Sequence, residues 1–243
     1  MHDPEDLIVP VQRPAQITFR AALRFAFALA LVLPAVPSRA ETPADESLRI
    51  YAVNIHQTPM QTWGPGYGIY LGKGLFITAA HVAGRTWWTR PKVAIAGQEF
   101  PTRVVKEGSL AETDLTLLAV DEDLLPVWLR LRRNPLCKAF PTPGADVVTV
   151  IPEGIARSRV LAPERLAANV RKFNSVIADV ATTGNSGSGV FDAHSKCLLG
   201  IMSRKISQSW TKRGTSQTIT RDIAKYFVPS TTIRDFIPPD ILF

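Results

Sequence analysis

The chain has 243 residues, 46% of them hydrophobic, so it can bury a substantial core as one large all-β unit or two small ones. Its 19 prolines, 15 glycines and short runs of Val, Ile, Thr and Phe favour many short strands joined by turns, and they argue against a helical bundle. The formal net charge is +7, but the basic residues are spread in ones and twos, which argues against a nucleic-acid-binding tract.

Residues 1–40 have the pattern of a secretory signal peptide. Arginines precede the apolar run 25–36, and the small residues Ser38 and Ala40 follow it. A membrane-spanning helix needs roughly 20 apolar residues, so an uncleaved membrane anchor is the weaker interpretation of this shorter run. We expect cleavage after Ala40 and a secreted or periplasmic protein without a stable membrane anchor.

Residues 41–125 are expected to form a first β-barrel. After a flexible lead-in over 41–46, β-prone runs predict strands over 49–55, 93–95, 103–106 and 115–120, and a hairpin over 66–78 that turns at Gly72-Lys73-Gly74. Residues 126–144 are interpreted as a linker, since proline and arginine interrupt the β-prone pattern near their start.

Residues 145–243 are expected to form a second barrel. Strands are predicted over 146–151, 158–161 and 176–180, with a hairpin over 189–203. Ser230 or Thr231 is expected to cap a closing helix that runs through Ile237 and ends at two prolines.

Three short segments carry residues suited to nucleophilic catalysis, in the chain order His, Asp, Ser. Thr78-Ala-Ala-His81 ends a predicted strand, where an imidazole would emerge into a cleft. Asp114 enters an apolar strand, where burial of its charge is costly without a partner such as an imidazole N–H. Ser186 lies in Gly-Asn-Ser-Gly-Ser-Gly, whose glycines allow a tight turn with converging backbone N–H groups, as an oxyanion hole requires.

Together these motifs resemble those of the trypsin-like serine peptidases, over residues 50–237. The resemblance implies two six-stranded antiparallel barrels of the chymotrypsin type with a short C-terminal helix. It also implies a catalytic triad of Ser186, His81 and Asp114, an oxyanion hole of the Gly184 and Ser186 N–H groups, a protein or peptide substrate, and no metal or cofactor. Asn185 departs from the Asp of trypsin-type zymogens, which disfavours activation by N-terminal trimming.

The same resemblance suggests residues that contact the substrate. Val180 is expected at the floor of the primary pocket, with Thr182, Ser203, Arg204 and Lys205 around it. An apolar floor argues against a preference for Lys or Arg, and we expect small apolar or acidic side chains to be preferred. The runner-up function is a catalytically inactive, protease-like binding module in the cell envelope.

Two further groups of residues remain to be placed. Cys137 and Cys197 could form a disulfide in an oxidising compartment, or could be two buried free thiols. Trp63, Trp87 and Trp88 are expected to be packing or barrel-rim residues rather than a ligand platform.

Overall fold

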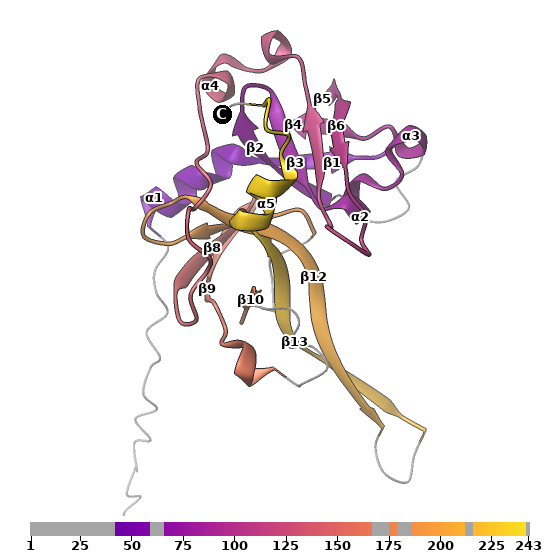
Figure 1. Cartoon of the computed structure of the whole chain (residues 1–243), viewed down its shortest axis with the longest axis vertical. Helices are drawn as coiled ribbons and strands as arrows, with labels where there is room; N and C mark the ends of the chain where they lie inside the picture. Colours follow the sequence, from indigo (N-terminus) through magenta and orange to yellow (C-terminus); the bar gives the residue numbers. More distant parts are fainter. Residues whose placement is uncertain (1–41, 59–65, 167–174, 179–185, 212–215, 242–243) are drawn as a thin grey trace, which may run out of the picture. The chain divides into compact units, whose positions relative to one another are not determined.

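The computed structural model describes residues 42–58, 66–166, 175–178, 186–211 and 216–241, and within them two antiparallel sheets dominate (Figure 1). The elements of the first part are α1 Pro43–Glu46, the 3-10 helix η1 Ser47–Tyr51, β1 Ala52–His56, β2 Gly66–Gly72, β3 Leu75–Thr78, α2 Ala80–Ala83, α3 Thr86–Thr89, β4 Lys92–Ile95, β5 Gln98–Pro101, β6 Arg103–Glu107 and β7 Thr116–Ala119. Those that follow are η2 Glu122–Leu124, α4 Val127–Arg130, β8 Asp146–Ile151, β9 Gly154–Arg159, η3 Pro163–Arg165, β10 Val176–Ile177, β11 Gly189–Asp192, β12 Leu198–Thr211, β13 Thr218–Pro229 and α5 Ser230–Phe236.

The first sheet has the strand order β5-β4-β1-β2-β3-β7-β6, and each neighbouring pair is antiparallel. The predicted hairpin at 66–78 is confirmed as β2 and β3, whose turn contains positive φ angles at Gly72, Lys73 and Gly74. This sheet has seven strands rather than the six expected. The extra strand is β5, in which only Phe100 is buried, so its sequence gives little apolar signal.

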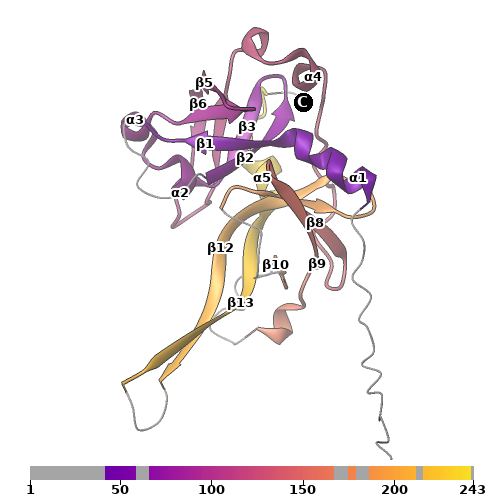
Figure 2. The same cartoon turned by 180° about the vertical axis from the view of Figure 1, so that it is seen from behind.

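The second sheet has the order β10-β13-β12-β11-β8-β9. The predicted hairpin over 189–203 is confirmed as β11 and β12, but β12 continues past Ser203 to Thr211 and there pairs with the outer part of β13, which was not predicted. Both views show this ribbon extending beyond the other strands of the sheet (Figures 1 and 2). With two curled antiparallel sheets and a closing helix, the structure confirms the predicted all-β, chymotrypsin-like class.

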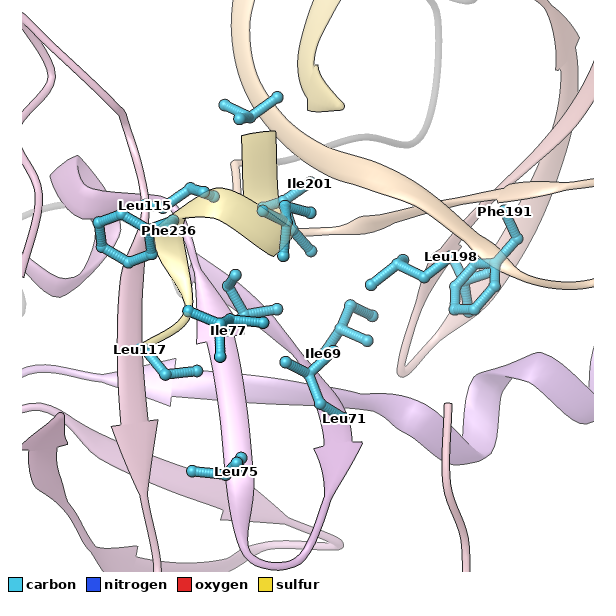
Figure 3. Packing of buried hydrophobic residues seen from close by; sticks show 14 of the residues in the cluster. Ile69, Leu71, Leu75, Ile77, Leu115, Leu117, Phe191, Leu198, Ile201 and Phe236 are labelled. Atoms are coloured by element: carbon cyan, nitrogen blue, oxygen red, sulfur yellow. The ribbon is translucent and has the colours of Figure 1, made fainter. Parts of the chain in front are cut away.

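A shared hydrophobic core joins the two sheets. Figure 3 shows Ile69 and Ile77 of the first sheet close to Ile201 and Leu198 of the second, with Phe236 of α5 in the same cluster. Each fully buried side chain of this kind stabilises the fold by about 1.5–3 kcal/mol relative to exposure. The two sheets are therefore joined by one continuous apolar layer.

Strands next to this layer are buried on both faces. In β2, Ile69 and Leu71 face the shared core, whereas Tyr70 belongs to a separate cluster inside the first sheet. In β3, Ile77 faces the shared core and Phe76 the inner cluster. Successive side chains of a strand point to opposite faces, so burial of both faces explains why these strands are continuous apolar runs rather than alternating ones.

The predicted flexible lead-in over 41–46 is wrong, since residues 43–46 form helix α1. Thr42 and Asp45 form a capping box, in which the Thr42 hydroxyl accepts from the Asp45 N–H and the Asp45 carboxylate accepts from the Thr42 N–H. The Asp45 side chain is fully buried and is ion-paired with Arg157 of β9 and Lys196. This charge pairing holds the segment against the second sheet, which composition alone does not reveal.

Smaller differences concern element ends. The first strand begins at Ala52 rather than 49, because η1 precedes it, and β9 spans 154–159 rather than 158–161. The expected cap of the closing helix is also wrong: Pro229 is the N-cap and Ser230 is the first helical residue. The Ser230 hydroxyl instead donates to the carbonyl oxygen of Cys137.

Cys137 and Cys197 form a disulfide, with their Cα atoms 5.1 Å apart. It ties the connection between the two sheets to the residue before β12. Arg234 of α5 also donates to the Cys137 carbonyl, so the disulfide, the connection and the closing helix meet at one point. The linker expected over 126–144 thus ends in an anchored segment.

The expected signal peptide, residues 1–40, lies outside the described residues. In the part of the chain that the structure describes, no helix has the length and apolar character needed to cross a membrane.

Candidate active site

His81 lies on the one-turn helix α2, directly after strand β3. Ala79 and Ala80 before it are buried, so their small side chains allow the turn to pack closely against the sheet. The imidazole Nδ1 lies 2.9 Å from Asp114 Oδ2 and 3.1 Å from Oδ1, while 31% of the side chain stays exposed. The ring therefore pairs with the carboxylate through one nitrogen and keeps an open face.

Asp114 lies just before β7 and is 2% exposed. Besides the imidazole, its Oδ1 accepts from the backbone N–H of His81 over 3.1 Å. Its Oδ2 accepts from the Ser203 hydroxyl over 2.5 Å. Burying a carboxylate is costly unless it is paired and hydrogen-bonded, and these three donors satisfy that condition.

The pKa of Asp114 reflects two opposing effects. Burial alone raises the pKa, but the hydrogen bonds from His81 and Ser203 and the charge of the imidazole outweigh burial, so the pKa lies below the ordinary value of 3.8. Asp114 is consequently ionised at neutral pH, the state in which it can orient an imidazole N–H and stabilise an imidazolium.

Ser186 lies in the turn before β11, and backbone hydrogen bonds on both sides hold that turn. The Tyr67 N–H of β2 donates to the Ser186 carbonyl over 3.0 Å. On the other side the Gly187 N–H donates to the Met202 carbonyl of β12 over 2.8 Å. The turn is thus fixed between β2 of the first sheet and β12 of the second, the strand that contains Ser203.

Gly187 is required by the shape of this turn. Its φ of +88° lies in the region that glycine favours. A Cβ at this position would also collide with the carbonyl oxygen of Tyr67, which itself accepts a 2.6 Å hydrogen bond from Thr78 Oγ1. The glycine after Ser186 therefore allows the close approach of two backbones.

The Ser186 hydroxyl donates to the backbone carbonyl of Ser203 over 3.2 Å. Within the described residues the Ser186 hydroxyl makes this one hydrogen bond, and no hydrogen bond joins it to His81. Ser203 thus links the site: its carbonyl accepts from Ser186 and its hydroxyl donates to Asp114. Ser203 of β12 thereby connects Ser186 to Asp114, and Asp114 in turn pairs with His81.

The expected substrate-contact residues have different surroundings. Ser203 is 1% exposed, so its side chain serves Asp114. Arg204 donates to the Leu110 carbonyl over 3.0 Å, and Lys205 is ion-paired with Asp222 over 2.8 Å. Val180, Thr182 and Gly184 lie outside the described residues.

Ser203 was expected near the site from the family resemblance, but its hydrogen bond to Asp114 depends on the register of β12. Tyr226 of β13 was not singled out in the sequence: burial and the charge of Asp114 raise the pKa of its phenol and outweigh the lowering by Arg204. Within the described ranges, no three His, Cys, Asp or Glu side chains group in a way that could hold a metal ion.

Comparisons with known proteins identify the family and support the fold. The family model of the trypsin-like peptidase domain matches residues 66–201. No curated protein matches the sequence.

Solved structures of proteases resemble the fold. The HtrA-type protease AlgW with a tripeptide has a TM-score of 0.55 at 20% identity, over 80% of this chain and 62% of that chain. The active form of the Rv3671c protease from M. tuberculosis has a TM-score of 0.53 at 17% identity, over 80% and 82%. The serine endoprotease from Yersinia pestis has a TM-score of 0.53 at 17% identity, over 81% and 65%. At these identities the likeness supports the fold alone.

Proposed function

The chain belongs to the family of trypsin-like peptidase domains, and we propose that it is a serine endopeptidase with Ser186, His81 and Asp114 as its catalytic triad. The observation that carries the proposal is the Asp114 carboxylate, buried and held by His81 on one side and by Ser203, the residue bonded to Ser186, on the other. A buried carboxylate paired with a half-exposed imidazole is the arrangement that activates a serine nucleophile.

In the proposed reaction, Ser186 Oγ attacks the carbonyl carbon of the scissile peptide bond while His81 Nε2 takes the hydroxyl proton. His81 then gives this proton to the leaving amine, and the acyl-enzyme is hydrolysed by water activated in the same way. Asp114 stays ionised throughout and holds the Nδ1–H of the ring. The N–H groups of Ser186 and Gly184 are the proposed donors to the oxyanion, a stabilisation of about 3 kcal/mol per donor.

The proposed attack requires a rearrangement of the Ser186 side chain. Its hydroxyl must leave the Ser203 carbonyl and donate to His81 instead. A hydrogen bond of this kind is worth about 1 kcal/mol net, so exchanging it for one to His81 costs little free energy. The Ser203 carbonyl is then free for another donor.

We propose a protein or peptide as the substrate, as expected from the family. For an acidic substrate side chain, Arg204 and Lys205 are the proposed partners, although Arg204 already donates to the Leu110 carbonyl and Lys205 is paired with Asp222. A preference for small apolar or acidic side chains remains part of the proposal. It predicts that a peptide library is not cleaved mainly after Lys or Arg.

We also propose that the protein is exported. The disulfide between Cys137 and Cys197 supports this, since disulfides persist mainly in oxidising compartments. The signal-peptide pattern of residues 1–40 gives independent support. N-terminal sequencing of exported protein is expected to begin at residue 41, and an intact N-terminus would contradict cleavage.

The catalytic proposal is tested by labelling the purified protein with a fluorophosphonate probe, which reacts with activated serines. We expect labelling of the wild type and none of Ser186→Ala or His81→Ala. Ser188→Ala is the matched control, because its buried hydroxyl makes no hydrogen bond in the described structure and lies two residues away. A folded wild-type protein that is not labelled would contradict the proposal and favour a binding module.

A further inference from the structure

Trp87 and Trp88 of α3 are exposed rather than packed. Their exposed fractions are 71% and 64%, which contradicts packing in the core and leaves the barrel rim as the part of the prediction that exposure allows. Their rings meet edge to face with centroids 6.0 Å apart, and together with Thr58 and Arg90 they line a surface pocket of about 460 Å³. Trp63 lies outside the described residues. Exposing two adjacent tryptophans to water is unfavourable in free energy, and exposed apolar patches of this kind often mark interaction sites.

The tryptophans are held outward by the other residues of their turn. Thr86 and Thr89 point inward: the Thr86 hydroxyl donates to Glu107, and the Thr89 hydroxyl donates to the carbonyl of Ala83 over 2.5 Å. The Thr58 N–H also donates to the Thr89 carbonyl over 2.6 Å. A turn fastened in this way presents a rigid aromatic surface, which loses little conformational entropy when a ligand binds.

This surface is attached to the helix that carries His81. The Ala83 carbonyl, which accepts from the Thr89 hydroxyl, belongs to α2. Val82 also belongs to α2, and its carbonyl accepts from the Gln57 side-chain amide over 2.6 Å. Both views show α2 and α3 next to each other at one end of the first sheet (Figures 1 and 2). The α3 turn is therefore held by a hydrogen bond to α2, the short helix that also carries His81.

Two arginines flank the tryptophans in the sequence Arg85-Thr-Trp-Trp-Thr-Arg90. Both are exposed, and within the described ranges neither guanidinium forms an ion pair or a hydrogen bond. Arg90 also lines the pocket with the tryptophans. Exposed aromatic rings beside unpaired guanidinium groups suit a partner that offers apolar side chains and carboxylates together.

We propose that Arg85, Trp87, Trp88 and Arg90, the α3 surface, bind a segment of the substrate polypeptide that carries apolar and acidic side chains outside the scissile bond. The inference rests on the proposed function for the identity of its ligand as a substrate. The tryptophans receive the apolar side chains, and the arginines pair with the carboxylates. The surface thereby raises the affinity for long substrates and leaves the chemistry at Ser186 unchanged.

Binding is measured separately from catalysis, with the full-length Ser186→Ala variant and a fluorescein-labelled dodecapeptide of alternating Glu and Phe. Fluorescence anisotropy is expected to show saturable binding that weakens as salt is raised, since exposed charge pairs are screened. Replacing Glu by Gln, or Phe by Ala, in the peptide should each weaken binding. Absence of saturable binding, or binding equal for the three peptides, overturns the inference.

Variants of the protein locate the binding. Trp87→Ala and Trp88→Ala, singly and together, and the pair Arg85→Gln with Arg90→Gln, should raise the Kd about tenfold or more, as for aromatic and arginine contacts at interface centres. The controls are Trp128→Ala on α4, an exposed tryptophan elsewhere, and Arg103→Gln on β6, an exposed arginine elsewhere. An equal effect of the control variants overturns the inference.

Labelling of the otherwise wild-type protein by the fluorophosphonate probe distinguishes this inference from the proposed function. The α3 variants should be labelled at the wild-type rate, because they leave the site at Ser186 intact. Binding of the peptide by a protein that is never labelled contradicts the peptidase and the substrate role together, whereas labelling without peptide binding contradicts the α3 surface alone.

Discussion

The hydroxyl of Ser203 donates to Asp114 Oδ2 over 2.5 Å, although Asp114 precedes a strand of the first sheet, Ser203 lies in the second sheet, and the two are 89 positions apart in the chain. The carbonyl of the same serine accepts from the Ser186 hydroxyl. Docking of the second sheet on the first therefore completes the hydrogen bonding of the carboxylate. A change that loosens this docking should reduce activity even where no triad residue is touched.

Ser203→Ala removes one of the two side-chain donors to Asp114. We expect the rate of fluorophosphonate labelling to fall about tenfold, since a hydrogen bond to a charged group is worth about 1.5 kcal/mol. The backbone carbonyl that bonds Ser186 is retained. Thr116→Val is the control, because its buried hydroxyl is not hydrogen-bonded in the described structure, and its labelling rate should stay unchanged. An unchanged rate in Ser203→Ala would show that His81 alone orients Asp114.

Gly187→Ala should destabilise the protein and abolish labelling. A Cβ would meet the Tyr67 carbonyl at a backbone φ of +88°, so we expect a loss of unfolding free energy of at least about 3 kcal/mol, measured by urea denaturation. Gly144→Ala is closely matched, with φ +86° and no atom within 4 Å of the added Cβ, and should cost about 1 kcal/mol. Equal losses in the two variants would show that backbone conformation, not the Tyr67 contact, sets the cost.

Asp45→Asn tests the charge pairing of the N-terminal segment. The variant leaves Arg157 and Lys196 without their carboxylate, and these two side chains are 23% and 28% exposed. We therefore expect a loss of about 2 kcal/mol of unfolding free energy, below the 3–5 kcal/mol of a fully buried pair. Asp123→Asn removes a pair whose carboxylate is 90% exposed, and should cost less than about 0.5 kcal/mol.

The same variant should change how stability depends on pH. Burial raises the pKa of Asp45, but hydrogen bonds from Lys196, Arg157 and Thr42 lower it by a larger amount. The pKa in the folded protein therefore lies well below the ordinary value of 3.8. The stabilisation is therefore fully present above about pH 4 and is lost as the pH falls through the folded pKa. Between about pH 4 and pH 2 the unfolding free energy should fall less steeply in Asp45→Asn than in the wild type. Parallel curves would contradict this assignment.

The disulfide should contribute to stability through the unfolded chain. It closes a loop with a sequence separation of 60, for which loss of loop entropy predicts about 4 kcal/mol. Thermal unfolding of the double variant Cys137→Ala, Cys197→Ala, compared with the oxidised wild type, should show a matching decrease. The reduced wild type is the control for the substitutions themselves. No difference between oxidised and reduced protein would contradict the prediction.

The fold class and the residues of the predicted triad could be inferred from local sequence patterns. Short apolar runs and glycine-flanked turns are local patterns, and the hairpin at 66–78 follows from a few neighbouring residues. The same is true of the small alanines before His81 and of the glycine after Ser186, because a tight turn depends on its own backbone conformation.

Which distant groups meet could not be inferred from local sequence and is seen in the three-dimensional structure. The bond from Ser203 to Asp114 depends on how two sheets dock, and the burial of Asp45 depends on Arg157 and Lys196 reaching it from far along the chain. The polar outer part of β12, residues 204–211, gives no apolar alternation, so its length follows from pairing with β13. Exposure of Trp87 and Trp88 likewise follows from Thr86 and Thr89 bonding inward, since a side chain's surroundings are set by segments that its local sequence does not contain.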